Sequence, residues 1–249
     1  MTEKSVYGDL RREIVRWIAS RVENAGMNGV VIGLSGGIDS GVTAALCAEA
    51  VGKENVLGLI MPCGSIAEDT EDGHRIADFL GIEAREIDLT RVLEAFAAAG
   101  ELDTGDRLNL ANVKARLRMA MEYACSSGRL VAGTGNLSET VTGYWTKWGD
   151  GAADFLPLAE LWKDEVAKLA EHMGLPEWLV SRVPSAGLWK GQTDEGEMGV
   201  TYDQIKKYHT QGRESVPDAA AGRIAELYSG SAHKREPIPF FHARGLLDG

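Results

Sequence analysis

A short apolar run that ends in a serine-glycine-glycine turn constrains the fold of this chain more than any other stretch. The run covers about 29–34, the turn reads Ser35-Gly36-Gly37-Ile38-Asp39-Ser40, and an alanine-rich helical pattern follows over about 39–51. A strand, a glycine turn and a helix in this order form an anion site, because the turn's N–H groups and the positive end of the helix dipole face the same point. The glycines also let the backbone approach an oxyanion closely. We therefore predict that the chain binds phosphate groups here.

The turn matches neither of two common phosphate-binding fingerprints. No Gly-Lys-Ser/Thr closes it, as a Walker A loop requires, and it lacks the spacing Gly-x-Gly-x-x-Gly. Ser35 and Ser40 add hydroxyl donors, and Asp39 lies in the first helical turn, where its carboxylate can hold Mg²⁺. An ordinary glycine-rich turn is the alternative. Hydroxyls and a carboxylate at this spacing, directly after a buried strand, disfavour that alternative.

Composition and charge narrow the class of protein. A chain of 249 residues, 44% hydrophobic and 25% charged, can form one large α/β domain or two small ones. A formal charge of −11 argues against a nucleic-acid partner, which needs a basic face. No apolar run approaches the ~20 residues that span a membrane, and the first residues carry no signal-peptide pattern. The cysteines indicate neither a disulfide framework nor a zinc site, so a reducing, cytoplasmic location is expected. They are Cys47, Cys63 and Cys125.

Strand and helix patterns alternate along the chain, which predicts a doubly wound parallel sheet flanked by helices, in a single domain over 1–249. The predicted strands cover about 29–34, 56–61, 83–88 and 129–133. The predicted helices cover about 6–24, 39–51, 69–80, 89–99, 108–125, 160–173, 201–211 and 216–228. Parallel strands bind ligands at their carboxyl ends, so the loops after the first, second and fourth strands should converge.

The loop after the fourth predicted strand, 134–154, is unusually rich in polar and aromatic residues. Its opening resembles half of a dinucleotide fingerprint, which is weak evidence alone. Further on it offers a carboxylate at Glu139, a cation at Lys147 and two aromatic rings that can stack on a base. Such a density of aromatic residues is more typical of a binding or buried surface than of a solvated loop. We predict that Glu139 and Asp39 bind one Mg²⁺ together.

Several separated motifs together resemble a known family. Ser35–Ser40 is similar to the pyrophosphatase loop of the N-type ATP pyrophosphatases. Further motifs, in order and in register over about 30–240, resemble NAD⁺ synthetase. They are Asn112-Val113-Lys114-Ala115-Arg116-Leu117-Arg118-Met119, Gly133-Thr134 with Glu139, Thr146-Lys147-Trp148-Gly149-Asp150-Gly151-Ala152-Ala153-Asp154, Gly199-Val200-Thr201-Tyr202-Asp203 and His233-Lys234-Arg235.

The resemblance implies a ligase reaction with ATP as co-substrate and Mg²⁺ as cofactor. ATP adenylates the nicotinate carboxylate of deamido-NAD⁺ and releases pyrophosphate, and ammonia then displaces AMP to give NAD⁺. Asp39 and Glu139 are expected to hold the metal, and Asp39 and Asp154 to be catalytic, with Asp154 accepting a proton from ammonium. The expected ATP-binding residues are Gly33, Leu34, Ser35, Gly36, Gly37, Ile38, Asp39, Ser40, Thr134, Lys163 and Ser185. Those expected to bind deamido-NAD⁺ are Arg116, Lys147, Asp154, His233 and Lys234.

The resemblance also implies partners and moving parts. Family members are homodimers whose deamido-NAD⁺ site is shared between subunits, and the stripe Leu10/Trp17/Ile18 and helix 108–125 are candidate interfaces. No glutaminase domain fits before the first strand, so free ammonia or a separate glutaminase should supply nitrogen. The stretches 62–68 and 184–199 are expected to act as lids that protect the acyl-adenylate from water.

Two other functions remain open from the sequence. One is another ATP-pyrophosphatase ligase, such as a GMP-synthetase-like core or a tRNA-modifying enzyme; the acidic charge disfavours the latter, and the segment Lys147–Asp154 with the His233-Lys234-Arg235 motif disfavours the former. The other is a non-catalytic adenine-nucleotide sensor. A sensor does not need the second metal ligand that Glu139 provides.

Overall fold

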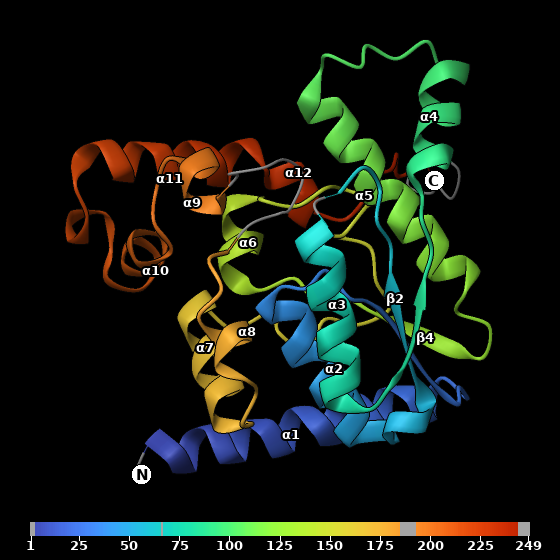
Figure 1. Cartoon of the computed structure of the whole chain (residues 1–249). Coiled ribbons are helices and arrows are strands. Elements are labelled where there is room, and N and C mark those ends of the chain that lie inside the picture. The colour runs from blue at the N-terminus through green and yellow to red at the C-terminus, as the bar shows by residue number, and fades with distance from the viewer. Residues whose placement is uncertain (1–2, 66, 185–192, 244–249) are drawn as a thin grey trace.

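The computed structural model describes residues 3–65, 67–184 and 193–243. Within these ranges a four-stranded parallel sheet forms in the order β3-β2-β1-β4 (Figure 1). The strands are β1 (Gly29–Gly33), β2 (Val56–Ile60), β3 (Glu83–Glu86) and β4 (Arg129–Ala132). The helices of ten residues or more are α1 (Glu3–Asn24), α2 (Ile38–Val51), α3 (Ala67–Leu80), α4 (Thr90–Ala99), α5 (Arg107–Ala124), α7 (Lys163–His172), α10 (Tyr202–Gln211) and α11 (Asp218–Gly230). The predicted fold class, a parallel sheet flanked by helices, is confirmed.

Alternating side chains of the strands bury both faces of the sheet. Val30 and Ile32 pack with residues of α1, α2, α3 and α7 on one face. Val31 faces the other way and packs with residues of β2, β4 and helices α4 and α5. β1 pairs with β2 on one side, Val31 opposite Leu57, and with β4 on the other, Val31 opposite Val131. The strand order therefore reverses between β1 and β4, and the crevice at their carboxyl ends is where such sheets bind ligands.

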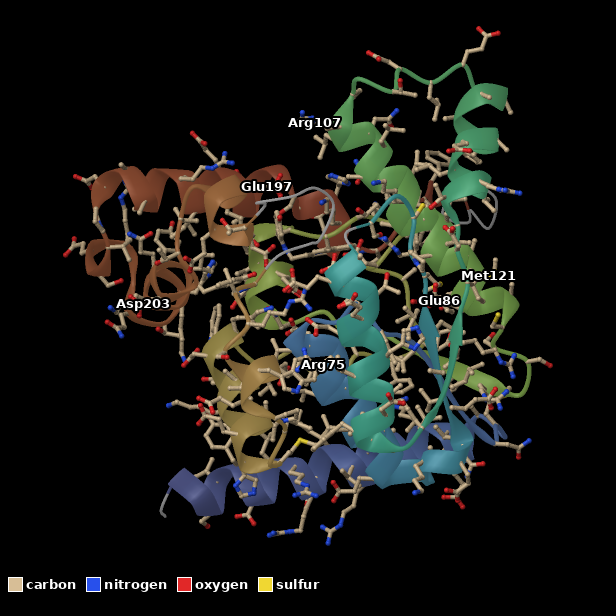
Figure 2. All side chains as sticks on the ribbon, viewed as in Figure 1. Arg75, Glu86, Arg107, Met121, Glu197 and Asp203 are labelled. Carbon is tan, nitrogen blue, oxygen red and sulfur yellow. The ribbon has the colours of Figure 1, made fainter. Side chains whose placement is uncertain are left out.

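A third apolar cluster lies beside the sheet and joins the C-terminal helices to the loop after β4. Trp162, Met198, Ile205 and Ile224 are its buried centre, and Leu137 of α6 (Leu137–Thr142) packs against it. Figure 1 shows α10 and α11 forming this lobe to one side of α6 and α7, and Figure 2 places Asp203 on it. No helix in the described ranges is long and apolar enough to cross a membrane.

The structure differs from the predicted elements in a few segments. α6 forms inside the stretch 134–154, which the sequence predicts to be a loop, because Asn136 and Glu139 make a reciprocal capping box. Short helices also form where none is predicted. These are α8 (Glu177–Val180), α9 (Asp194–Met198) and α12 (Ala232–Arg235), with the 3₁₀ turns η1 (Lys53–Asn55) and η2 (Arg213–Ser215).

α1 covers the chain's own core. Ile18 is fully buried, Val22 nearly so, and the helix contacts α2 and α7. Trp17 stays 38% exposed, with its ring edge-on to Phe155 at 6.0 Å. Ile18 therefore cannot contribute to a dimer interface as the sequence suggests, because packing on the sheet has already removed it from solvent.

Candidate active site

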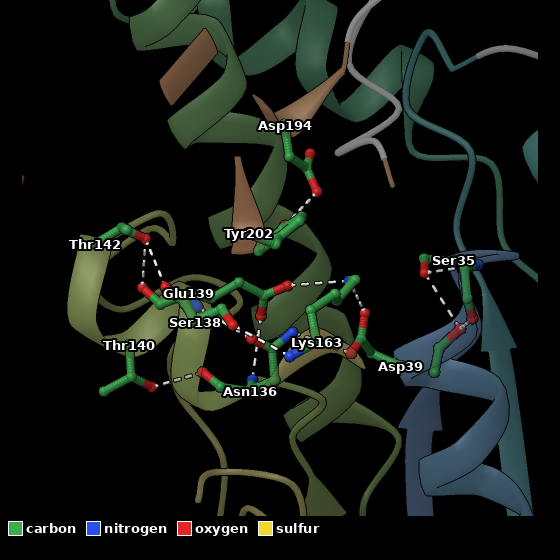
Figure 3. A network of polar contacts seen from close by, with 12 residues as sticks. Ser35, Asp39, Asn136, Ser138, Glu139, Thr140, Thr142, Lys163, Asp194 and Tyr202 are labelled. Carbon is green, nitrogen blue, oxygen red and sulfur yellow. Dashed lines mark hydrogen bonds and ion pairs between the residues drawn. The ribbon is translucent and has the colours of Figure 1, made fainter. Parts of the chain in front are cut away.

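Two carboxylates and one lysine meet at the carboxyl end of β1 and β4. Asp39 lies in the first turn of α2, Glu139 in the first turn of α6, and Lys163 begins α7. The Lys163 ammonium donates a hydrogen bond to Asp39 Oδ2, and its Nζ lies 3.5 Å from Glu139 Oε1 (Figure 3). Carboxylates are favoured in first turns because the helix dipole is positive there. The structure thus brings together three residues that are up to 124 positions apart in the sequence.

Burial makes this cluster electrostatically costly. Removal from water raises the pKa of Glu139 to about 8, the negative charge of Asp39 adds to the rise, and Lys163 opposes it. Burial alone would lower the pKa of Lys163, but its attraction to Asp39 and Glu139 outweighs that effect and raises the pKa. Lys163 therefore stays charged, and the raised pKa of Glu139 shows that a second negative charge beside Asp39 is costly unless a further cation offsets it.

Asn136 holds both carboxylates in place. Its Nδ2 donates to Asp39 Oδ1 at 3.0 Å, and its backbone N–H donates to Glu139 Oε2 at 3.2 Å. Its Oδ1 accepts from the Glu139 backbone N–H at 3.0 Å, and the residue is fully buried. Asn136 is not among the site residues predicted from the sequence. The signal that points to it is the spacing Asn-x-x-Glu at a helix start, typical of a capping box.

The Ser-Gly-Gly turn presents backbone donors beside this cluster. Ser40 Oγ donates to Gly37 O at 2.8 Å, and Gly37 N–H donates to Ser35 Oγ at 3.3 Å. Among the described residues, no side chain caps the N-terminus of α2 at Gly37. Leu34 and Ile38 are buried in the core, so only their backbone faces this side. The first N–H groups of α2 are thus available to an anion.

A second set of predicted residues also comes together, around the loop 143–147. Arg116 Nε and Nη2 donate to Lys147 O at 3.3 and 3.2 Å, and Lys147 Nζ donates to His233 O at 2.5 Å. Lys234 Nζ donates to Gly143 O at 2.6 Å and also to Trp145 O. Helix α12 is therefore docked on this loop, and the cationic residues predicted to bind deamido-NAD⁺ lie close together.

Asp154 occupies a different environment from the one its predicted role suggests. The side chain is exposed, whereas capture of ammonium in a closed pocket requires enclosure. Its Oδ2 accepts from the Val131 backbone N–H at 2.7 Å, and its Oδ1 accepts from Tyr123 Oη at 3.3 Å. Thr134, just after β4, is half-buried. Ser185 and the part of the predicted lid over 185–192 lie outside the described residues.

Asp194 is a further residue of the site and is not among those predicted from the sequence. It is 4% exposed, its Oδ2 accepts from Tyr202 Oη at 2.8 Å, and its charge contributes to raising the pKa of Lys163 (Figure 3). Its position in the acidic, glycine-rich stretch before α10 is the one sequence signal for it.

The fold is of the doubly wound α/β class, and an uncapped helix N-terminus next to a carboxylate cluster is an arrangement typical of nucleotide-dependent enzymes. Comparison with known proteins gives the family. The NAD synthase family profile matches residues 10–238. An NH₃-dependent NAD⁺ synthetase of Archaeoglobus fulgidus is 44% identical over 242 residues, which cover 94% of this chain and 96% of that protein.

Solved structures agree with this result. The structure titled NMN synthetase from Francisella tularensis has a TM-score of 0.90 at 38% identity, covering 95% of this chain and 98% of that one. The NH₃-dependent NAD synthetase of Campylobacter jejuni, in complex with nitrate, has a TM-score of 0.81 at 29% identity, covering 95% and 99%. The chain belongs to the NAD synthase family. The predicted family, fold class and identity as an ATP-dependent ligase that makes NAD⁺ are confirmed.

Proposed function

We propose that this chain amidates deamido-NAD⁺ with ATP and ammonia in two steps at the crevice between β1 and β4. The nicotinate carboxylate attacks the α-phosphorus of ATP and releases pyrophosphate, and ammonia then attacks the acyl carbon and releases AMP. The observation that carries the proposal is the Asp39–Lys163–Glu139 cluster, which lies beside a turn whose helix N-terminus has no side-chain cap in the described chain.

The turn and the cluster support binding of the triphosphate. Backbone N–H groups of Gly33–Ser40 would cradle the phosphates, with Thr134, Lys163 and Ser185 as further ATP contacts. Lys163 is charged and nine-tenths buried, so it can stabilise the departing pyrophosphate without reorganisation of water.

The donor set at the cluster fits Mg²⁺. Asp39 and Glu139 supply hard carboxylate oxygens. They are only two ligands, since no group of three or more metal-binding side chains lies together in the described ranges. Mg²⁺ commonly binds through one or two carboxylates and completes its shell with water and substrate phosphates. When bound, the ion would supply charge stabilisation to the leaving group.

The second set of residues supports binding of deamido-NAD⁺. Arg116, Lys147 and Lys234 place cationic groups around the loop 143–147, with His233 beside them, and such groups can neutralise a dinucleotide's phosphates. Asp154 can accept a proton from ammonium only if substrate or a partner subunit covers it, because its side chain is exposed. This requirement is consistent with a homodimer whose substrate site is shared between subunits.

The remaining parts of the proposal concern partners and place in the cell. The exposed apolar residues Val92, Phe96 and Leu108 lie on α4 and α5 and offer a dimer surface. Free ammonia, or ammonia from a separate glutaminase, is the nitrogen source, and the enzyme works in the cytoplasm. Because the Francisella neighbour is titled an NMN synthetase, nicotinate mononucleotide is a second candidate substrate with the same reacting carboxylate.

The test is an amidation assay with ATP, Mg²⁺ and ammonium, offering deamido-NAD⁺, nicotinate mononucleotide or XMP in turn. We expect NAD⁺ from deamido-NAD⁺ and no GMP from XMP. Faster amidation of the mononucleotide would reassign the substrate, and nucleotide binding without pyrophosphate release would indicate a sensor.

Two variants test the residue roles in the same assay. Asp39→Ala should abolish pyrophosphate release, whereas Asp203→Ala, an exposed first-turn aspartate of α10, should not. Asp154→Asn should retain adenylation of the substrate while its amidation by ammonia is reduced. Equal loss of both steps would mean that Asp154 positions substrate instead of handling ammonia.

A further inference from the structure

Arg182 reaches the Ser-Gly-Gly turn from the segment after α8. Its Nη1 donates to Gly36 O at 2.8 Å and to Asp72 Oδ2 at 2.6 Å, and its Nη2 donates to Asp69 Oδ1 at 2.5 Å. The side chain is 22% exposed, and those of Asp69 and Asp72 are 18% and 9% exposed. One guanidinium thus ties the turn to α3.

The packing around Gly36 leaves the turn little freedom. Gly36 has φ +79, a conformation that side-chain-bearing residues rarely adopt. A Cβ at this position would lie 2.8 Å from Arg182 Nη1 and 2.8 Å from Asp69 O. The backbone of the turn is therefore enclosed by Arg182 and α3 on the side of the Gly36 carbonyl.

The direction of one peptide group links this contact to phosphate binding. In a trans peptide the carbonyl of Gly36 and the N–H of Gly37 point in opposite directions in one plane. Because Arg182 holds the Gly36 carbonyl oxygen, the Gly37 N–H points away from α3. On that side its acceptor is Ser35 Oγ at 3.3 Å. A cation on the carbonyl also polarises the peptide and strengthens its N–H as a donor.

We infer that Arg182 is a positioning residue that orients the Gly36–Gly37 peptide so that its N–H can bind the β–γ pyrophosphate of ATP. The inference rests on the proposed function, in which this turn holds the triphosphate. Both Nη atoms of Arg182 already donate to two carboxylates and a carbonyl, so the inferred role is to hold the turn and not to bind phosphate directly. Its removal should affect nucleotides with a β–γ pyrophosphate and spare AMP.

Arg75 provides a matched control. It lies on α3 (Figure 2), and its Nη1 donates to the other oxygen of Asp72, Oδ1, at 2.6 Å. Its guanidinium also stacks over the Trp178 ring at 3.7 Å. Neither of these contacts is to the turn, so Arg75→Ala removes a partner of Asp72 without freeing the Gly36 carbonyl.

The experiment measures the affinity of the full chain for ATP and for AMP by calorimetry, in the absence of deamido-NAD⁺, together with thermal unfolding. We expect Arg182→Ala to weaken ATP binding by about tenfold to a hundredfold, since misplacing a binding group by about 1 Å has effects of this size. AMP binding should change by less than about twofold on the same argument. Arg182→Lys, which keeps a donor for the carbonyl, should recover part of the loss, and Arg75→Ala should bind ATP like the unaltered chain.

Each other result has a defined meaning. If Arg182→Ala binds ATP normally, or if ATP and AMP affinities fall together in step with thermal stability, the inference is overturned. Should Arg182→Ala not fold, Arg182→Lys and Asp69→Asn decide by the same comparison of ATP with AMP. If the unaltered chain binds ATP no better than AMP, the turn does not hold the pyrophosphate and the proposed function of the turn fails instead.

Discussion

Replacing Glu122 of α5 by glutamine should stabilise the folded chain at pH 8 and change little at pH 5. The Glu122 side chain is half-buried against the end of β1, and a Cβ on Gly33 would lie 2.3 Å from its Oε1. Burial, and then the negative charge of Asp150, raise the pKa of Glu122 from 4.5 to about 7, while Arg118 opposes the rise. Glutamine keeps the shape and removes the charge.

The sign follows from proton binding. Between pH 4.5 and 7 the folded state holds a proton on Glu122 that the unfolded state has released, so stability falls as pH rises through this window. A rise from 4.5 to about 7 corresponds to roughly 3 kcal/mol of destabilisation well above pH 7. Because water reaches the Glu122 side chain and screens its charge, we expect the destabilisation to be about 1–2 kcal/mol.

Urea unfolding at pH 5 and pH 8 measures this difference. Glu122→Gln should gain about 1–2 kcal/mol over the unaltered chain at pH 8 only. Glu94→Gln, at an exposed position of α4, is the control and should follow the unaltered chain at both pH values. If Glu122→Gln also follows the unaltered chain at both pH values, the carboxylate is better solvated than the structure indicates and the reasoning is wrong.

Other predictions concern the cluster, the C-terminal lobe and the docking of α12. Lys163→Met leaves Asp39 and Glu139 without their counter-charge and should lower the free energy of unfolding by roughly 3 kcal/mol, measured in urea; a loss below about 1 kcal/mol would contradict the assigned ion pairs. Burial, with the charge of Arg235, lowers the pKa of His209, so its contribution to stability is present above pH 6.5 and lost as pH falls below it. His209→Phe should reduce the fall of the melting temperature below pH 6.5. An unchanged slope would show that His209 does not cause that fall. Gly143 has φ +65, and a Cβ added there would lie 2.0 Å from the Cβ of Ser231. Gly143→Ala should therefore lower the free energy of unfolding, measured in urea, by about 2 kcal/mol or more. Gly222→Ala, inside α11 with no atom within 4 Å of the new methyl, should instead gain about 1 kcal/mol, and equal effects of the two would refute the clash.

Local patterns predicted the elements that depend on neighbouring residues. β1, the Ser-Gly-Gly turn and α2 follow one another in 23 residues, and their order alone indicated an anion site. The loop after β4 was harder to predict. Its residues 137–142 are polar and β-branched and carry little helical signal, and α6 forms because Asn136 and Glu139 cap it and Leu137 packs on the C-terminal lobe.

The sequence by itself determined the alternation of strands and helices and the succession of strand, Ser-Gly-Gly turn and helix, because each depends on spacing within a few residues. Only the tertiary structure decided which groups meet. Lys163 reaches Asp39 across 124 positions, and Arg182 reaches Gly36 across 146. It also left Asp154 exposed beside Tyr123. Contacts at such separations depend on how the helices pack on the sheet, and packing is set by the whole core rather than by the local sequence around any one residue.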